Sequence, residues 1–294
     1  MKYQIVSDSS MDLSEELAKE NNIEVVPFYV SFDSETYQKE IEEIAVRDFY
    51  QKMVDEKGVF PKTSCPSAQD FYNVFEKHAK ENVSIICICI STKFSSSMQS
   101  ALNAKDMIAE DYPDAEITVI DSQINTVLQG MYVLEACRLR DEGVEYKEAV
   151  ERLLAIRESG RIFFTIGSMD YLKHGGRIGK LAGIAASLLN VKPLITLKEG
   201  EIFSSRIVRN RKKSLQKVIE LLIAYIEERK IDMDTYRLCI GYGYSYEEAE
   251  EFKSMALEKL EKYGVKDIKL YQIGATIGVH TGPYPIGFGI IKKA

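Results

Sequence analysis

Five hydroxyl side chains lie within seven residues of one another and could bind an anion: Ser91, Thr92, Ser95, Ser96 and Ser97. They follow the uncharged, β-branched run 84–90 and precede a stretch that reads as the start of a helix. This order predicts a buried strand, a turn and a helix N-terminus. Unpaired N–H groups and the positive end of a helix dipole favour anions there, so a phosphate or carboxylate site is one interpretation. Ordinary N-capping is the other, although a cap needs one hydroxyl rather than five.

Histidine is the second kind of candidate, and the chain has three: His78, His174 and His280. His78 falls in a charged helical stretch, which predicts a surface position. His174 and His280 fall in glycine-rich segments that we interpret as loops, where glycine lets the backbone approach a ligand closely. Ser95, His280 and Asp121 could in principle form a hydrolase triad, but the G-x-S-x-G motif is absent.

The sequence lacks several common site motifs. No H-x-x-x-H or H-E-x-x-H pair is present, so we expect no metal site. Neither a G-x-G-x-x-G after the first strand nor a G-x-x-x-x-G-K-[ST] loop occurs, so both common nucleotide fingerprints are missing. We therefore expect no resident cofactor.

The amino-acid composition limits the kinds of partner that the protein is expected to bind. A net charge of −7 over 294 residues argues against general affinity for nucleic acid or for an anionic membrane surface. No apolar run approaches the roughly 20 residues that a membrane span needs, and no signal peptide is evident. The five cysteines are odd in number and mostly lie in apolar runs, which favours free thiols in a reducing cytoplasm. Cys87 and Cys89, two residues apart on a strand, are predicted to be buried packing residues.

The elements that would position these residues alternate between strand and helix. In the first half, strands near residues 3–7, 85–90 and 116–120 each end in a hydroxyl-rich turn. In a parallel sheet these turns meet at the carboxyl edge, where ligand sites of α/β proteins lie. We also predict one strand at residues 23–32, interrupted or at an edge because of Pro27, and a loop at residues 60–67. A capping box of Ser67 and Asp70 should start the next helix.

The second half continues the α/β alternation after a change of composition near Gly160. We predict a strand from 161, a helix at 181–189, a hairpin across 198–200, a basic segment at 206–213, further elements to residue 273, a glycine-rich loop at 274–283 and a last strand at 286–291. The chain is thus predicted to be one α/β domain, residues 1–294, with an N-terminal lobe at 1–160 and a C-terminal lobe at 161–294. The last segment would return to the cleft between the lobes.

Taken together, the segments resemble the bacterial DegV family of fatty-acid-binding proteins. The resemblance extends over nearly the whole chain and is carried by residues 8–10, 63–67, 90–101, 120–122, 172–178, 208–213 and 280–283. Two positions depart from the family pattern. The usual L-S-G-T turn reads Phe94-Ser95-Ser96-Ser97 here, and Cys65 stands where glutamine is common.

The resemblance implies a site at the carboxyl edge of the N-terminal parallel sheet and in the inter-lobe cleft. By resemblance, the carboxylate of a long-chain fatty acid would be held by Thr63 and Ser95, with the neighbouring Ser96 amide, and His280 matches the family histidine near the C-terminus. Arg177 and Arg209 would face a partner or a phosphate. Family members can present the bound acid to a separate fatty acid kinase, which forms an acyl phosphate.

We therefore expect a non-catalytic carrier of a palmitate-class fatty acid. Burial of ten methylenes contributes on the order of 8 kcal/mol before ordering costs, so the tail can supply the affinity and the head site the orientation. The alternative is a phosphoryl- or acyl-transfer enzyme that uses His280 and Arg177 on a small anionic substrate. A third interpretation is a regulatory module that binds its partner through the basic segment 206–213.

Overall fold

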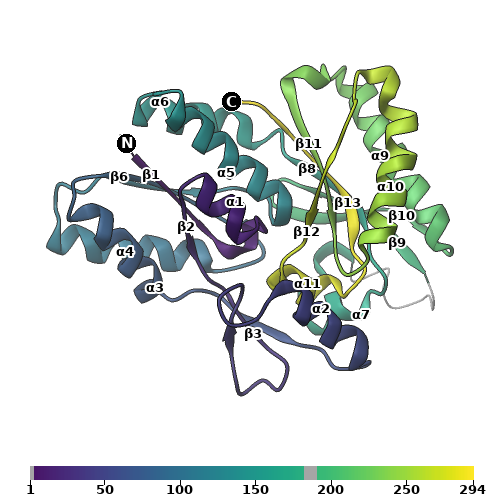
Figure 1. Cartoon of the computed structure of the whole chain (residues 1–294), viewed down its shortest axis with the longest axis horizontal. Coiled ribbons are helices and arrows are strands. Elements are labelled where there is room, and N and C mark those ends of the chain that lie inside the picture. Colours follow the sequence, from purple (N-terminus) through teal and green to yellow (C-terminus); the bar gives the residue numbers. More distant parts are fainter. Residues whose placement is uncertain (1–2, 182–190) are drawn as a thin grey trace.

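The protein was analysed as a computed structural model, which describes residues 3–181 and 191–294. Two sheets of α/β type lie side by side, with helices packed on their faces (Figure 1). Nearly all of the predicted helix 181–189 lies outside the described residues. Among the described residues, no helix is long and apolar enough to cross a lipid bilayer.

The first sheet is parallel, as the repeated strand–turn–helix pattern predicts. Its strand order is β2-β1-β6-β7, where β1 is Tyr3–Asp8, β2 is Ile23–Val26, β6 is Ser84–Cys89 and β7 is Ile117–Asp121. Helices α3 (Ala68–Ala79) and α4 (Ser97–Asp111) pack on one face. Because helices cover both faces, the strands are apolar throughout. Cys87 and Cys89 are fully buried on the α3–α4 face, which confirms their prediction as packing residues.

The predicted strand 23–32 is wrong as a single element. Pro27 lies between two strands, β2 and β3 (Tyr29–Ser31), which belong to different sheets. Proline has no N–H to donate to a ladder, so the chain leaves the first sheet there. The predicted loop 60–67 is also partly wrong, because it contains β5 (Lys62–Ser64), which pairs with β3 in a small antiparallel sheet that also includes β4 (Gln38–Lys39).

The second sheet has the order β10-β9-β8-β13-β11-β12 and is antiparallel except for the pair β11–β12. Its strands are β8 (Arg161–Thr165), β9 (Lys192–Lys198), β10 (Glu201–Val208), β11 (Tyr236–Tyr242), β12 (Lys269–Gln272) and β13 (Ile286–Lys292). Helices α9 (Arg211–Arg229) and α10 (Tyr246–Leu260) cover one face of the sheet through an apolar cluster (Figure 1). The predicted hairpin across 198–200 is present.

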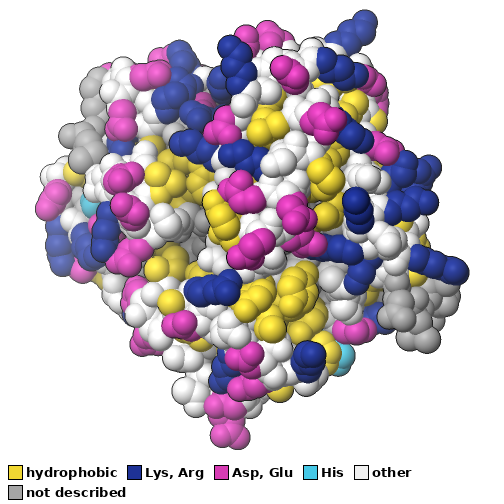
Figure 2. All heavy atoms as spheres, turned by 45° about the vertical axis from the view of Figure 1, so that its right-hand side comes forward, with side chains coloured by type: hydrophobic (Ala, Val, Ile, Leu, Met, Phe, Trp, Pro, Cys, Tyr) yellow, Lys and Arg dark blue, Asp and Glu magenta, His cyan; other side chains and the backbone are white. Residues whose placement is uncertain are grey.

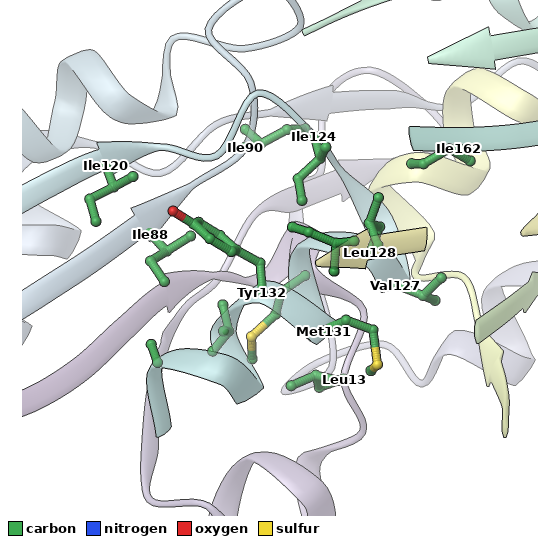
Figure 3. Close-up of a cluster of buried hydrophobic side chains, with 14 of the residues drawn as sticks. Leu13, Ile88, Ile90, Ile120, Ile124, Val127, Leu128, Met131, Tyr132 and Ile162 are labelled. Carbon is green, nitrogen blue, oxygen red and sulfur yellow. The ribbon is translucent and has the colours of Figure 1, made fainter. Parts of the chain in front are cut away.

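Helix α5 (Thr126–Asp141) joins the two sheets. Of its 16 residues, 13 are buried, so it is enclosed on nearly all sides, as expected of a helix in the interior of a large core. Figure 3 shows its side chains Val127, Leu128, Met131 and Tyr132 among isoleucines of both sheets. A Cβ at Gly130 would lie 2.5 Å from the carbonyl oxygen of Met11, so glycine is needed for this close packing. Helix α5 therefore sets the spacing between the sheets.

The predicted glycine-rich loop near the C-terminus is wrong, because residues Ala275–Thr281 form helix α11. This helix packs against α2 (Val46–Asp55), α7 (Asp170–His174) and β3. Ala275 and Val279 share an apolar cluster with Phe49 and Tyr50 of α2. The last part of the chain thus crosses back onto the N-terminal half. The division into an N-terminal lobe at 1–160 and a C-terminal lobe at 161–294 remains a prediction.

One face of the molecule shows how the charge is distributed. In Figure 2, Lys and Arg side chains lie interspersed with Asp and Glu over most of this face, and basic side chains gather at its right-hand edge. Opposite charges that alternate in this way cancel at a distance. On this face, therefore, positive charge is local rather than extended.

Candidate functional site

A cavity of about 280 Å³ opens where the carboxyl edge of the first sheet meets β5, α11 and the second sheet. Its size is close to the lower end of the range for small-molecule sites, roughly 300–1,000 Å³. Its walls comprise Phe28, Thr63, Ser64, Cys65, Ile90, Phe94, Ser95, Ser96, Asn125, Phe164, Leu172, Arg177, Ile202, Thr276, Ile277, His280 and Thr281. The polar residues come mainly from β5, the turn after β6 and α11, whereas the apolar residues come from several elements, among them Phe164 and Ile202 of the second sheet and Ile277 of α11.

Five of the six site residues predicted from the sequence line this cavity: Thr63, Ser95, Ser96, Arg177 and His280. The sixth, Arg209, does not line it. Arg209 is exposed just beyond the end of β10.

Thr63 and His280 are 217 residues apart in the sequence and meet at the polar end of the cavity. Thr63 lies on β5, where it pairs with Val30 of β3, and His280 lies near the end of α11. The Thr63 hydroxyl and the His280 Nε2 are 3.2 Å apart, within hydrogen-bonding distance. Two elements that the sequence predicted as loops therefore place these two groups.

The electrostatic state of His280 follows from its surroundings. Burial, and to a smaller extent the nearby Arg177 guanidinium, lower the pKa of this imidazole to about 4. The ring is therefore neutral near pH 7. Its Nδ1 is buried without a hydrogen-bond partner among the described residues, and a Cβ at Gly175 would lie 2.2 Å from that atom.

The five hydroxyls of the 91–97 turn divide into two groups. Three take part in the fold: Ser91 donates to the Gly200 carbonyl, Thr92 to the Asp121 carboxylate and Ser97 to the Asp8 carboxylate. The other two, Ser95 and Ser96, line the cavity. The Ser95 hydroxyl also accepts a hydrogen bond from the Ser97 amide at 3.1 Å, whereas Ser96, the N-cap residue of α4, makes no side-chain capping bond.

Asp8 organises this turn, a role that the sequence did not reveal. Its buried carboxylate accepts hydrogen bonds from the Ile90 amide, the hydroxyls of Ser10 and Ser97, and the side-chain amide of Gln129. Burial raises the pKa of this carboxyl, and the four donors oppose that shift. Asp8 thus links the end of β1 to the end of β6 and the start of α4. Its position directly after a strand was the available signal, but it does not touch the cavity.

Arg177 lies at the rim of the cavity. Its guanidinium donates to the carbonyl oxygens of Phe94 and Gly175, at 3.2 and 2.8 Å. The side chain is exposed, yet these two bonds hold it against the turn that carries Ser95. It can therefore add positive charge at the entrance without occupying the interior.

The apolar part of the cavity continues into a smaller one of about 40 Å³. The two share Asn125, Phe164, Ile277 and Thr281, and the smaller cavity lies between α5 and the second sheet. Phe164 and Ile277 line both cavities, and the sequence did not single them out. An apolar residue that lines a ligand cavity and one that packs the core have the same local pattern, so no sequence signal separates them.

The remaining histidines lie elsewhere. His78 is only 16% exposed, and its Nε2 lies 3.5 Å from a Glu24 carboxylate oxygen, so the predicted surface position is wrong. His174 ends α7, and its ring stacks on Phe60 with 3.6 Å between centroids.

The arrangement does not form a hydrolase triad. The His280 Nε2 is bonded to Thr63, and the Asp121 carboxylate accepts from Thr92 and from the Gln123 amide. Across residues 3–181 and 191–294, no group of three or more His, Cys, Asp or Glu side chains could hold a metal ion. What the site does offer is a set of hydroxyl groups and a neutral imidazole together with apolar wall residues.

Known proteins are similar in sequence to this chain over its full length. A family model described as an uncharacterised protein of the DegV family matches residues 2–293. A DegV domain-containing protein of Clostridium perfringens is 30% identical over 294 residues, with 100% of both chains covered. The DegV domain-containing protein YteA of Lactococcus lactis is 32% identical over 298 residues, covering 100% of this chain and 99% of its own.

Solved structures share the fold as well. A stearic acid-binding protein from Eubacterium ventriosum has a TM-score of 0.94 and 43% identity, covering 99% of this chain and 98% of its own. A DegV family protein from Thermus thermophilus, described by its fatty acid binding, has a TM-score of 0.86 and 31% identity, covering 99% of this chain and 100% of its own. The match over nearly all residues, in sequence and in fold, shows that the chain belongs to the DegV family.

Proposed function

We propose that this protein binds one long-chain fatty acid, with the carboxylate at Thr63, Ser95 and Ser96 and the tail along the apolar walls. The observation that supports this most is the make-up of the cavity wall, which combines hydroxyls and a neutral imidazole with apolar side chains such as Phe164 and Ile277. Relatives of the same fold are described as fatty-acid-binding proteins.

At the head end, His280 would orient Thr63. A neutral imidazole carries one N–H, and placing it on Nε2 lets His280 donate to the Thr63 oxygen. The Thr63 hydroxyl is then free to donate to a carboxylate oxygen. A hydrogen bond to a charged group contributes about 1.5–3 kcal/mol, so a few such donors can fix the head without a bidentate arginine.

At the tail end, the affinity would come from apolar burial. Each buried methylene contributes about 0.8 kcal/mol, and the walls supply Phe28, Phe164, Leu172 and Ile277 as contacts. A palmitate-class acid would extend from the head site toward Phe164 and Ile277, where the smaller cavity begins. Selectivity for chain length would then be set at that junction.

We place this binding protein in the cytoplasm as a non-catalytic carrier that transports the acid or presents it to a separate fatty acid kinase. All five cysteines are free thiols, which supports a reducing compartment. The carboxylate would lie near the cavity entrance beside Arg177, where a partner enzyme can reach it. Exposed Arg209 is a candidate contact for that partner.

The experiment begins with mass spectrometry of lipid extracted from the purified protein. We expect one fatty acid per chain; repeated extracts without fatty acid would refute the proposal. Replacing both Thr63 and Ser95 by Ala removes two donors to a charged group, which costs roughly 3 kcal/mol, or about 100-fold in Kd. Ser100→Ala, in α4 and outside the cavity, is the matched control and should leave Kd unchanged.

The transferase alternative is tested in the same preparation. The protein is incubated with labelled ATP and palmitate, alone and then with a fatty acid kinase. The carrier proposal expects turnover only when the kinase is present. Transfer by the protein alone would favour the enzyme.

A further inference from the structure

A larger cavity, of about 550 Å³, lies on another part of the molecule and shares no lining residue with the two described above. It is bounded by the turn after β1, helix α1 (Glu15–Glu20), the segment between β4 and α2, and strands β11 and β12. Its lining residues are Ser9, Asp12, Leu13, Ser14, Glu15, Leu17, Glu40, Ile41, Ala45, Val46, Tyr242, Leu270, Tyr271, Gln272 and Gly274. The proposed fatty acid site makes no use of this space.

Two buried carboxyl groups, those of Asp12 and Glu40, line this cavity; the residues are 6% and 1% exposed. Glu40 is well bonded, because it accepts from the Ser9 hydroxyl and from the amide and hydroxyl of Thr276. Asp12 is not. Its Oδ2 accepts from the Thr126 hydroxyl, but its Oδ1 has no hydrogen-bond partner among the described residues. A buried oxygen without a donor is costly, so it marks a position where a donor from outside would be stabilising.

The two carboxyl groups face the same small space. A Cβ at Gly274 would lie 2.4 Å from the Asp12 Oδ1 and 2.5 Å from the Glu40 Oε1. The two oxygens are therefore separated by no more than the sum of those distances. A side chain at residue 274 would clash with both oxygens, so glycine is required there for the two carboxyl groups to lie this close to the backbone.

The charge of the pair is not compensated by the protein. No Lys or Arg lines the cavity, and no described Lys or Arg forms an ion pair with either carboxyl. Burial and mutual repulsion raise the pKa of Asp12, and burial raises that of Glu40, while Asp8 adds further negative charge. Tyr50 and Tyr242 also titrate nearby. Burial thus favours the protonated form of each carboxyl, and an added positive charge between them would favour the ionised form instead.

The rest of the wall suits the body of an organic cation. Leu13, Leu17 and Leu270 supply apolar surface, and the rings of Tyr242 and Tyr271 can contact a cation through their faces. A divalent metal fits less well, because no group of three or more His, Cys, Asp or Glu side chains among the described residues is placed to hold one. An ammonium group needs only hydrogen-bond acceptors, which Asp12 Oδ1 and Glu40 Oε1 offer.

We propose that this cavity binds a small alkylammonium ion, with its charged end between Asp12 and Glu40 and its chain against the leucines and tyrosines. The probe is n-hexylammonium chloride, and its neutral counterpart is 1-hexanol, of similar size and shape. Binding is measured by isothermal titration calorimetry on the full chain. We expect saturable binding of the ammonium at least tenfold tighter than that of the alcohol.

The variant Asp12→Asn tests the charge without changing the backbone preference. Asp12 has φ 52°, a left-handed conformation that Asn adopts as readily as Asp. We expect at least a tenfold loss of ammonium affinity in Asp12→Asn and none in Glu16→Gln, an exposed carboxylate on α1 that does not line the cavity. Thermal unfolding of each variant verifies that it is folded. Glu40→Gln provides a second test should Asp12→Asn fail to fold.

Proton release gives an independent readout. Titrations in two buffers of different ionisation enthalpy should show that binding of the ammonium releases protons, because its positive charge opposes the raised pKa of the two carboxyls. Equal affinity for ammonium and alcohol, or full affinity in Asp12→Asn, would overturn the proposal, because the probe would then sit in a generic apolar space such as the fatty acid cavity. Displacement of the probe by millimolar KCl would assign the position to an inorganic cation and would also overturn it.

Discussion

His280 should make the stability of the ligand-free protein depend on pH in a defined window. In the folded protein the pKa of this imidazole is about 4, against 6.5 for an unperturbed histidine. Between these values the unfolded chain binds a proton at this position and the folded chain does not. The stabilisation is therefore present above pH 6.5 and is lost as the pH falls through 4.

The size of the effect follows from the two pKa values. Relative to pH 7, the contribution of His280 should decrease by up to about 2 kcal/mol at pH 5 and by up to about 3 kcal/mol at pH 4. Asp8, Asp12 and Glu40 have raised pKa values, so their contributions change with pH in the opposite sense. The total curve of the native protein therefore does not isolate His280, and a comparison is needed.

The comparison is with His280→Gln, whose amide can still donate to Thr63 but does not titrate. Free energies of unfolding are measured by urea denaturation at pH 4, 5, 6 and 7 on delipidated protein, because a bound carboxylate near the ring would favour its protonation. Subtracting the free energy of unfolding of the variant from that of the native protein removes the pH dependence of all groups that titrate alike in both. In parallel, the chain has only three histidines, so the Hε1 signal that disappears in the variant identifies His280 in NMR titrations.

Two results would refute the reasoning. If the difference between native and variant protein stays flat from pH 7 to pH 5, His280 titrates equally in the folded and unfolded states. If its NMR signal titrates near 6.5, burial at the head of the cavity does not exclude the charged form. Either result would also remove the neutral imidazole from the proposed head site.

Two further predictions concern the turn beside the site and the proposed partner. Asp8→Ala leaves buried donors such as the Ser97 hydroxyl and the Ile90 amide without an acceptor, so we expect a loss of about 3 kcal/mol in urea unfolding; a loss below about 1 kcal/mol would mean that the turn does not depend on Asp8. For Arg209→Glu we expect unchanged fatty acid affinity but weaker acyl phosphate formation with a fatty acid kinase, measured with labelled ATP, and normal coupling would exclude Arg209 from docking.

Much of the fold could be predicted from local patterns. The buried run at β6 and its hydroxyl turn indicated a parallel strand followed by a helix, and Ser67 with Asp70 marked the start of α3 by a capping box that the structure contains. The errors occurred where the local pattern was ambiguous. Glycine-rich residues 274–283 read as a loop, yet α11 forms there because Ala275 and Val279 are buried against α2, and this packing outweighs the low helix propensity of glycine.

The sequence by itself determined the alternation of strands and helices, the family, and the identity of five residues that line one cavity. Those features depend on neighbours in the chain, whose periodicity and capping are visible without a structure. Only the tertiary structure decided that Thr63 lies on a strand, that His280 lies on a helix, and that the two meet within 3.2 Å. It also revealed the unpaired oxygen of Asp12 beside Glu40. Burial and desolvation depend on contacts between residues that are far apart in the sequence. For this physical reason, no local sequence pattern could indicate the Thr63–His280 contact or the unpaired Asp12 oxygen.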